Sequence, residues 1–168
     1  MIYYCKPESC LYKLQTLSVQ KALRQSGVLM KGSCLCGDIQ FEVKGVKPSL
    51  YQCHCSVCRK STGSSSNTAA IVNETEFNWI KKASDIQEFN LDSGYSVNFC
   101  GRCGSPVPNK LRGRKLVWLP AGLLEEHGLK VTQHIFVGSK APWDIIGGSA
   151  THHEEMPSLE KFVQLLDR

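Results

Sequence analysis

Seven of the nine cysteines in this 168-residue chain fall in three short clusters. The clusters read SCLCG, CHCSVC and FCGRCG, and their members are Cys34, Cys36, Cys53, Cys55, Cys58, Cys100 and Cys103. A disulfide joins two sulfurs with a specific torsion, whereas a metal ion gathers several thiolates at one point. Closely spaced cysteines without a secretory apolar segment are typical of metal sites in a reducing compartment. We therefore expect a metal-binding, cytoplasmic protein.

The number of clustered cysteines predicts two zinc sites of different kinds. A structural zinc takes four protein ligands, while a catalytic zinc takes three and leaves one position for water or substrate. Seven thiolates fill one site and leave the second a ligand short. Spacing alone does not fix the pairing. It favours the CHCSVC cysteines as the three-ligand site, because they are local to one another, and the SCLCG and FCGRCG pairs as the four-ligand site. An iron–sulfur cluster is the alternative for four thiolates.

His54 is the first candidate for the missing ligand, because it lies between two cysteines. If Cys53 and Cys55 lie on an extended strand, their sulfurs leave one face and His54 points to the other. We therefore expect the fourth position to stay open for a substrate. Solvated or core positions, and not metal binding, are expected for the other histidines, which are His127, His134, His152 and His153.

The segments that must position these cysteines read as short strands joined by turns. Alternating apolar residues between turn-forming residues predict strands over 38–43, 67–72, 76–80, 86–91, 96–100, 115–120 and 133–138. Apolar residues at helical spacing after Ser158 predict a C-terminal helix over 158–167. A looser helical spacing predicts a short helix near the N-terminus. We expect a mainly β domain over residues 31–168, preceded by a helical extension over residues 1–30.

The overall composition argues against several classes of protein. The formal net charge of +5 is modest, and the basic residues form no dense stripe with interleaved aromatics, so nucleic-acid binding is not expected. No apolar run is long enough to span a membrane. The length suits one domain with an appendage. No pattern in the sequence specifies an oligomeric state.

Four segments, in this order along the chain, are similar to those of a known family: GSCLCGDIQFEV, CHCSVCRKSTG, NFCGRCGSPV and HIFVGSKAPWDII. They resemble the glutathione-dependent formaldehyde-activating enzyme family, which includes centromere protein V, from about residue 31 to residue 146. The resemblance implies a β-tent of several small antiparallel sheets with zinc-knuckle loops. It also implies two zinc ions per chain, with a structural zinc at Cys34, Cys36, Cys100 and Cys103 and a catalytic zinc at Cys53, Cys55 and Cys58.

The reaction that the resemblance implies joins formaldehyde to the thiol of glutathione and gives S-hydroxymethylglutathione, a carbon–sulfur lyase type of chemistry. Glutathione is anionic, so its site should offer cations. Arg59 and Lys60 directly follow Cys58, and Lys140 lies in SKAPW, so each is a candidate for binding a substrate carboxylate. A solvated surface charge, or compensation of the anionic zinc site, is the alternative for all three. Trp143 is expected to pack in the core or in a loop.

Two other functions compete with an enzyme that uses a thiol and an aldehyde. One is a non-enzymatic zinc module that binds protein or nucleic acid. The other is a metal or thiol sensor that uses the open site as a redox-sensitive zinc reservoir. Metal content distinguishes them: two zinc ions with an open three-thiolate site favour the enzyme, while one zinc, or a site closed by a protein ligand, favours the binding module.

Overall fold

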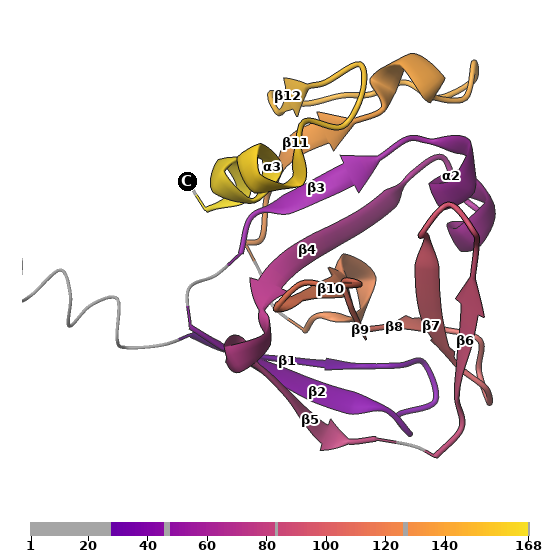
Figure 1. Cartoon of the computed structure of the whole chain (residues 1–168), viewed down its shortest axis with the longest axis vertical. Coiled ribbons are helices and arrows are strands. Elements are labelled where there is room, and N and C mark those ends of the chain that lie inside the picture. The colour runs from indigo at the N-terminus through magenta and orange to yellow at the C-terminus, as the bar shows by residue number, and fades with distance from the viewer. Residues whose placement is uncertain (1–27, 46–47, 83, 126–127, 168) are drawn as a thin grey trace, which may run out of the picture.

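The computed structural model describes residues 28–45, 48–82, 84–125 and 128–167 (Figure 1). These residues form twelve strands in three sheets, together with two α-helices. The chain is therefore mainly β, as predicted. The predicted N-terminal helix falls on residues outside the described ranges. No helix among the described residues is both long enough and apolar enough to cross a membrane.

The first sheet is antiparallel and contains β1 (Val28–Ser33), β2 (Gln40–Gly45) and β5 (Phe77–Lys81), in the order β1-β2-β5. Its central strand shows the alternation that predicts a half-buried strand. Phe41 and Val43 are fully buried, and Ile39, which precedes β2, is buried as well. Phe41 and Val43 belong to a core cluster that also contains residues of the second sheet, such as Val72 and Leu119.

The second sheet has six strands in the order β12-β11-β3-β4-β10-β9. The strands are β3 (Leu50–Cys53), β4 (Asn67–Asn73), β9 (Asn109–Lys110), β10 (Leu116–Pro120), β11 (Val131–Ile135) and β12 (Thr151–His152). Two pairings depart from the antiparallel pattern, because β11 runs parallel to both β3 and β12. The predicted C-terminal helix is present as α3 (Leu159–Leu166), capped by Ser158. Its buried Phe162 packs edge-on against Tyr51 of β3, with ring centroids 5.0 Å apart.

The third sheet contains β6 (Ile86–Asn90), β7 (Ser96–Cys100) and β8 (Pro106–Val107), all antiparallel. The β6–β7 hairpin turns at Asp92-Ser93-Gly94, as predicted, and Gly94 adopts a φ of +92° there. Three 3₁₀ turns complete the fold: η1 (Glu74–Glu76), η2 (Ala121–Leu123) and η3 (Val137–Ser139). Figure 1 shows the hairpin standing beside α2 (Ser56–Thr62).

Two elements near the cysteines differ from the prediction. The strand predicted over 133–138 ends at Ile135, because Phe136 adopts a left-handed conformation with φ of 56° that no strand can continue. The chain then turns into η3. The strand carrying Cys53 also ends at that residue, so Cys55 is not part of a strand. It is the N-cap of α2, where the sequence suggested only a turn.

Candidate functional site

Four cysteines from two distant parts of the chain meet at the edges of the first and third sheets. Cys34 and Cys36 lie in the turn after β1, Cys100 ends β7, and Cys103 lies in the turn before β8. Every pair of their sulfurs lies within 4.8 Å, and all four are free thiols. The sulfur of Cys36 is 3.5 Å from that of Cys34 and 3.7 Å from that of Cys100. Neighbouring sulfurs in a tetrahedral zinc–thiolate site lie about 3.8 Å apart, so the group fits zinc.

The two turns that carry this four-sulfur group are fixed by backbone and side-chain contacts. The Ile39 amide donates to the Cys34 sulfur at 3.4 Å, and the Leu35 amide donates to Ser105 Oγ at 3.1 Å. Gly101 lies so close to the Asp85 carboxylate that a Cβ would clash with it. Gly104 has a φ of +72°, which favours glycine. Both glycines of CGRCG therefore have a structural role.

Three charged side chains lie beside the four-sulfur group. Asp38 pairs with Arg102 at 2.6 Å and with Lys81 at 3.0 Å. These hydrogen bonds, from Arg102 first and Lys81 second, lower the pKa of Asp38 to about 2. The Cys36 sulfur lies 3.7 Å from the same carboxylate. The carboxylate and its two cations form a charged cluster beside the sulfurs.

The remaining three clustered cysteines form a second group within six residues of chain. Cys53 ends β3, Cys55 caps α2, and Cys58 lies in the first turn of that helix, with every pair of sulfurs within 4.8 Å. The Cys58 amide donates to the Cys55 sulfur at 3.4 Å, which helps to start the helix. Cys53 and Cys58 are buried, while Cys55 is partly exposed. This three-sulfur group is thus covered by protein on one side and reachable from the other.

Two thiols of the three-sulfur group have pKa values shifted in opposite directions. A hydrogen bond from Cys58 lowers the pKa of Cys53 to about 6, whereas the same contact, together with burial, raises the pKa of Cys58. A thiolate at Cys53 is the form that a metal ion binds. The group therefore has the donor set of a zinc site that is one ligand short of a tetrahedron.

His54 points away from the sulfurs, as predicted, and is buried in a polar network. Its Nδ1 lies 3.0 Å from Asp144 Oδ2, and its Nε2 lies 3.0 Å from Nδ1 of His134. His54 is 2% exposed and His134 is 3% exposed. A carboxylate can only accept, so Nδ1 of His54 carries the proton and, in the neutral ring, Nε2 accepts from His134. The network ties the β3–α2 junction, which carries two of the sulfurs, to the SKAPWD segment.

This histidine network extends to the surface through one more ring. His152 lies edge-on to His134, with ring centroids 5.0 Å apart, and is exposed. Burial, followed by the neighbouring His54 and His152, lowers the pKa of His134. Within the described residues, the only groups of three or more side chains able to hold a metal ion are the two sulfur groups. The prediction that His134 and His152 occupy core or solvated positions agrees with this arrangement.

The three predicted substrate-binding cations do not gather at one place. Arg59 reaches from α2 toward SKAPW, where Nη2 donates weakly to the Ser139 carbonyl at 3.4 Å. Lys140 is exposed and donates to the Asp144 carbonyl at 2.8 Å. Lys60 lies on another side of α2, where it lines a pocket against the β6–β7 hairpin. Trp143, expected to be packed, is 69% exposed, so that expectation was wrong.

Two residues near the three-sulfur group were not identified from the sequence. The Tyr95 hydroxyl donates to Ser61 Oγ at 2.7 Å, which connects the β6–β7 hairpin to α2. Burial raises the pKa of Tyr95, the hydrogen bond with Ser61 opposes this, and charge on the three cysteines adds to the increase. The only feature of the sequence that could have indicated Tyr95 is its place directly after the turn at Gly94.

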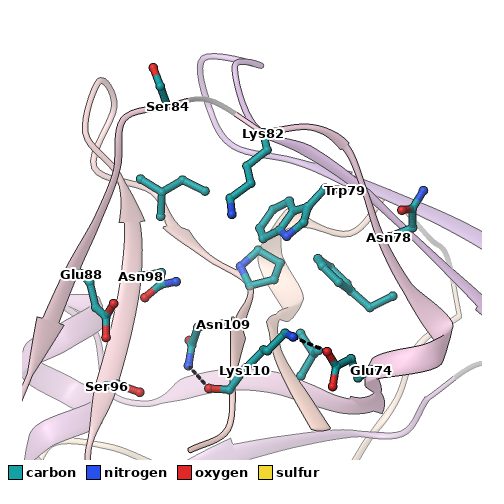
Figure 2. Close-up of a pocket in the computed structure, with 14 residues that line it drawn as sticks. Glu74, Asn78, Trp79, Lys82, Ser84, Glu88, Ser96, Asn98, Asn109 and Lys110 are labelled. Atoms are coloured by element: carbon teal, nitrogen blue, oxygen red, sulfur yellow. Dashed lines mark hydrogen bonds and ion pairs between the residues drawn. The ribbon is translucent and has the colours of Figure 1, made fainter. Parts of the chain in front are cut away.

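A larger pocket, of about 980 Å³, contains no cysteine (Figure 2). Ser96 and Asn98 line it from one face of β7, while Tyr95 and Val97 point to the opposite face, toward α2. Figure 2 shows Trp79 in its wall with Lys82 beside the ring, 6.0 Å from the centroid, and Lys110 paired with Glu74. The β6–β7 hairpin therefore separates this pocket from α2 and from Cys58, which is buried on that helix.

Comparison with known proteins shows which family this chain matches. The model of the family described as "Glutathione-dependent formaldehyde-activating enzyme" matches residues 29–139, which contain all seven clustered cysteines. The chain belongs to this family. The match covers β1 from its second residue and both sulfur groups, and it ends at Ser139, which Arg59 contacts. The formaldehyde-activating enzyme family thus accounts for the part of the chain that builds both candidate metal sites.

Two individual matches were also found. A protein of Halomonas elongata, named "Putative glutathione-dependent formaldehyde-activating enzyme", is 30% identical over 86 residues, which are 48% of this chain and 55% of that protein. The chain thus spans about half the length of this curated relative. A crystal structure of a Rhodobacter sphaeroides protein matches with a TM-score of 0.48 and 20% identity, over 61% of this chain and 99% of that one.

Proposed function

We propose that the chain adds a glutathione-like thiol to formaldehyde or a related aldehyde, at a zinc ion held by Cys53, Cys55 and Cys58. The observation that supports this most directly is the contrast between two groups of sulfurs in one small domain, four in one and three in the other. Four thiolates complete a tetrahedral site with protein atoms alone, while three leave one position for a substrate. Membership of the formaldehyde-activating enzyme family supports the same assignment.

Zinc bound by the three-sulfur group would lower the pKa of a coordinated thiol, so that the thiolate forms at neutral pH. The chain's own residues set the conditions for this chemistry. Cys53 and Cys58 are buried, which keeps water from one side of the group, and Cys55 at the helix cap leaves the other side reachable. Addition forms one carbon–sulfur bond, the carbonyl π electrons move to oxygen, and the oxygen takes up a proton. No oxidant is needed.

We further propose that Arg59 binds a carboxylate of the thiol substrate. Its Nε is buried and has no hydrogen-bond partner among the described residues, and Nη2 makes only the weak contact with Ser139. A carboxylate would satisfy both nitrogens through two parallel hydrogen bonds. Lys140, which follows Ser139, would add a second positive charge on the same side of α2.

The four-sulfur group has a structural part in this proposal. A zinc ion held by Cys34, Cys36, Cys100 and Cys103 would tie the turn after β1 to the turn between β7 and β8. These turns belong to different sheets, so the ion would fix the third sheet against the first. The β6–β7 hairpin, which carries Tyr95 toward α2, would be positioned through the same link.

The proposal is tested by the rate of S-hydroxymethylglutathione formation with zinc-loaded protein, measured by NMR exchange against a protein-free background. We expect acceleration by the native chain and by Cys10→Ala, a control outside the three clusters. Cys58→Ala should lose the acceleration, because it removes a ligand of the three-sulfur group. A rate equal to the background for fully zinc-loaded native protein would contradict the proposal.

A further inference from the structure

A pocket of about 500 Å³ lies between the β6–β7 hairpin and α2, the helix that carries Cys58. Its lining residues are Val57, Lys60, Ser61, Phe89, Leu91, Tyr95 and Val97. The helix that supplies the first three also holds Cys58 and is capped by Cys55. The pocket and the three-sulfur group therefore share one helix.

The apolar side chains of this pocket lie outside the three hydrophobic clusters, although Val97 itself is buried. Val57, Phe89, Leu91 and Val97 belong to none of the three hydrophobic clusters. Phe89 of β6 is 52% exposed, and the residues on either side of it in the chain, Glu88 and Asn90, are polar. Apolar surface left in water is unfavourable by roughly 25 cal/mol per Å². A ligand with an apolar group would cover these side chains.

The polar groups of the pocket are few and lie toward α2. Tyr95 donates to Ser61, so the Ser61 O–H and the free lone pairs of both oxygens remain for a ligand. Lys60 forms no ion pair with a described residue, and no acidic side chain lines the pocket. The pocket thus offers an apolar wall, two hydroxyls and one cation, a chemistry suited to an apolar molecule with a polar end.

The lining of this pocket suits neither formaldehyde nor glutathione as its occupant. Formaldehyde has one carbon and cannot fill the pocket, and glutathione is a charged, hydrophilic tripeptide. Arg59 and Lys60 follow each other on α2, but Arg59 reaches Ser139 while Lys60 faces the hairpin. The two cations therefore serve different sides of the helix, with the proposed thiol carboxylate on the Arg59 side.

We infer that the pocket holds the apolar chain or ring of the carbonyl substrate, so that the aldehyde used at the three-sulfur group is larger than formaldehyde. The inference rests on the function proposed above and names its substrate class. In the reaction the thiolate sulfur bonds to the aldehyde carbon, the π pair moves to oxygen, and the proton lost by the thiol is balanced by the one that oxygen gains. The apolar group of the aldehyde stays against Phe89, Leu91 and Val97.

The test compares pentanal with formaldehyde on zinc-loaded protein with glutathione. We expect the native chain to have a lower KM for pentanal than for formaldehyde. Phe89→Ala should raise the pentanal KM about tenfold, since each methylene that loses an apolar contact weakens binding roughly fourfold. The formaldehyde rate should stay within about twofold. Ile80→Ala, at a side chain that is 49% exposed on β5, is the matched control and should change neither.

Equal KM values for the two aldehydes, or a pentanal KM that Phe89→Ala does not change, would overturn the inference. Failure of the proposed function is recognised separately, because then neither aldehyde reacts faster than background and the substrate assignment falls with it. Titration with 1-pentanol, which cannot react, tests the pocket without catalysis. NMR shifts of the Val57 and Val97 methyl groups that saturate, and that Phe89→Ala weakens, support an apolar ligand. The absence of such shifts overturns the inference that this pocket binds an apolar group.

Discussion

Cys103 is the partly exposed member of the four-sulfur group that contacts Ser105. Its sulfur lies 3.3 Å from Ser105 Oγ, and this hydrogen bond, together with that from the Ser105 backbone, lowers the pKa of Cys103 to about 5. A thiol with so low a pKa is a thiolate at neutral pH and is ready to bind a metal ion. At the scale of single residues, no pattern in the sequence indicated the contact with this serine.

Loss of Cys103 should unfold much of the domain. Binding of structural zinc is worth about 10 kcal/mol or more in small peptides, and three ligands retain only part of it. We expect Cys103→Ala to show low soluble yield and a melting temperature well below that of the native chain, measured by circular dichroism. Cys10→Ala is the control. Melting of Cys103→Ala at the native temperature would contradict a structural metal site.

Arg59 and Lys60 are adjacent in sequence but should differ in their effect on glutathione. Hydrogen bonds to charged groups contribute roughly 1.5–3 kcal/mol, so Arg59→Ala should raise the glutathione KM about tenfold or more. Lys60→Ala should change it by about twofold or less, because Lys60 faces the hairpin pocket. Steady-state kinetics at fixed formaldehyde measure both. The opposite order would show that Arg59 merely offsets the charge of the sulfur group.

At the scale of elements, the junction between β3 and α2 depends on a segment 90 residues away. Asp144 and His134 hold His54 between them, and His54 separates two of the three sulfurs in sequence. The sequence predicted correctly that His54 points away from the sulfurs. It could not predict the Asp144 contact, which requires β11 to pair with β3 and Phe136 to turn the chain. The helix α2 was missed for a related reason, since seven residues have little helical stability of their own.

Removal of the Asp144 carboxylate should loosen the three-sulfur group before it unfolds the protein. Leaving a buried imidazole N–H unsatisfied costs about 1–3 kcal/mol. We expect Asp144→Ala to release zinc from this group at lower chelator concentration, while the four-sulfur group keeps its ion. A chelator titration followed by colorimetry and circular dichroism measures both. Release indistinguishable from that of the native chain would show that the network does not position the cysteines.

The same network predicts a loss of stability in weak acid. Because the pKa of buried His134 lies below its ordinary value of 6.5, protonation favours the unfolded chain. Its contribution is complete above about pH 6.5 and decreases as the pH falls below that value. Asp144 opposes this shift, while His54 and His152 add to it. Urea unfolding at pH 7.5 and 5.5 should show a smaller pH difference for His134→Gln than for the native chain. An equal difference would assign the acid sensitivity to other groups.

At the scale of the whole molecule, much of the architecture could be predicted from local patterns. Alternating residues located β2, β4, β5, β6, β7 and β10, and cysteine spacing brought the correct sulfurs together in groups of four and three. The parallel pairing of β11, the Tyr95–Ser61 contact and the separation of Arg59 from Lys60 depend on how distant elements pack. Residues that make such contacts carry no local pattern, so the sulfur groups were predicted more completely than the pocket between α2 and the β6–β7 hairpin.

On the function proposed here, the three-sulfur group holds zinc with one position open to a thiol. X-ray absorption at the zinc edge tests it most directly, on protein loaded with two zinc ions. The two groups together predict an average of three and a half sulfurs per zinc without substrate, and four when glutathione is added. S-methylglutathione, which has no free thiol, should leave the average unchanged. An average that saturating glutathione does not raise would contradict an open zinc position at the three-sulfur group.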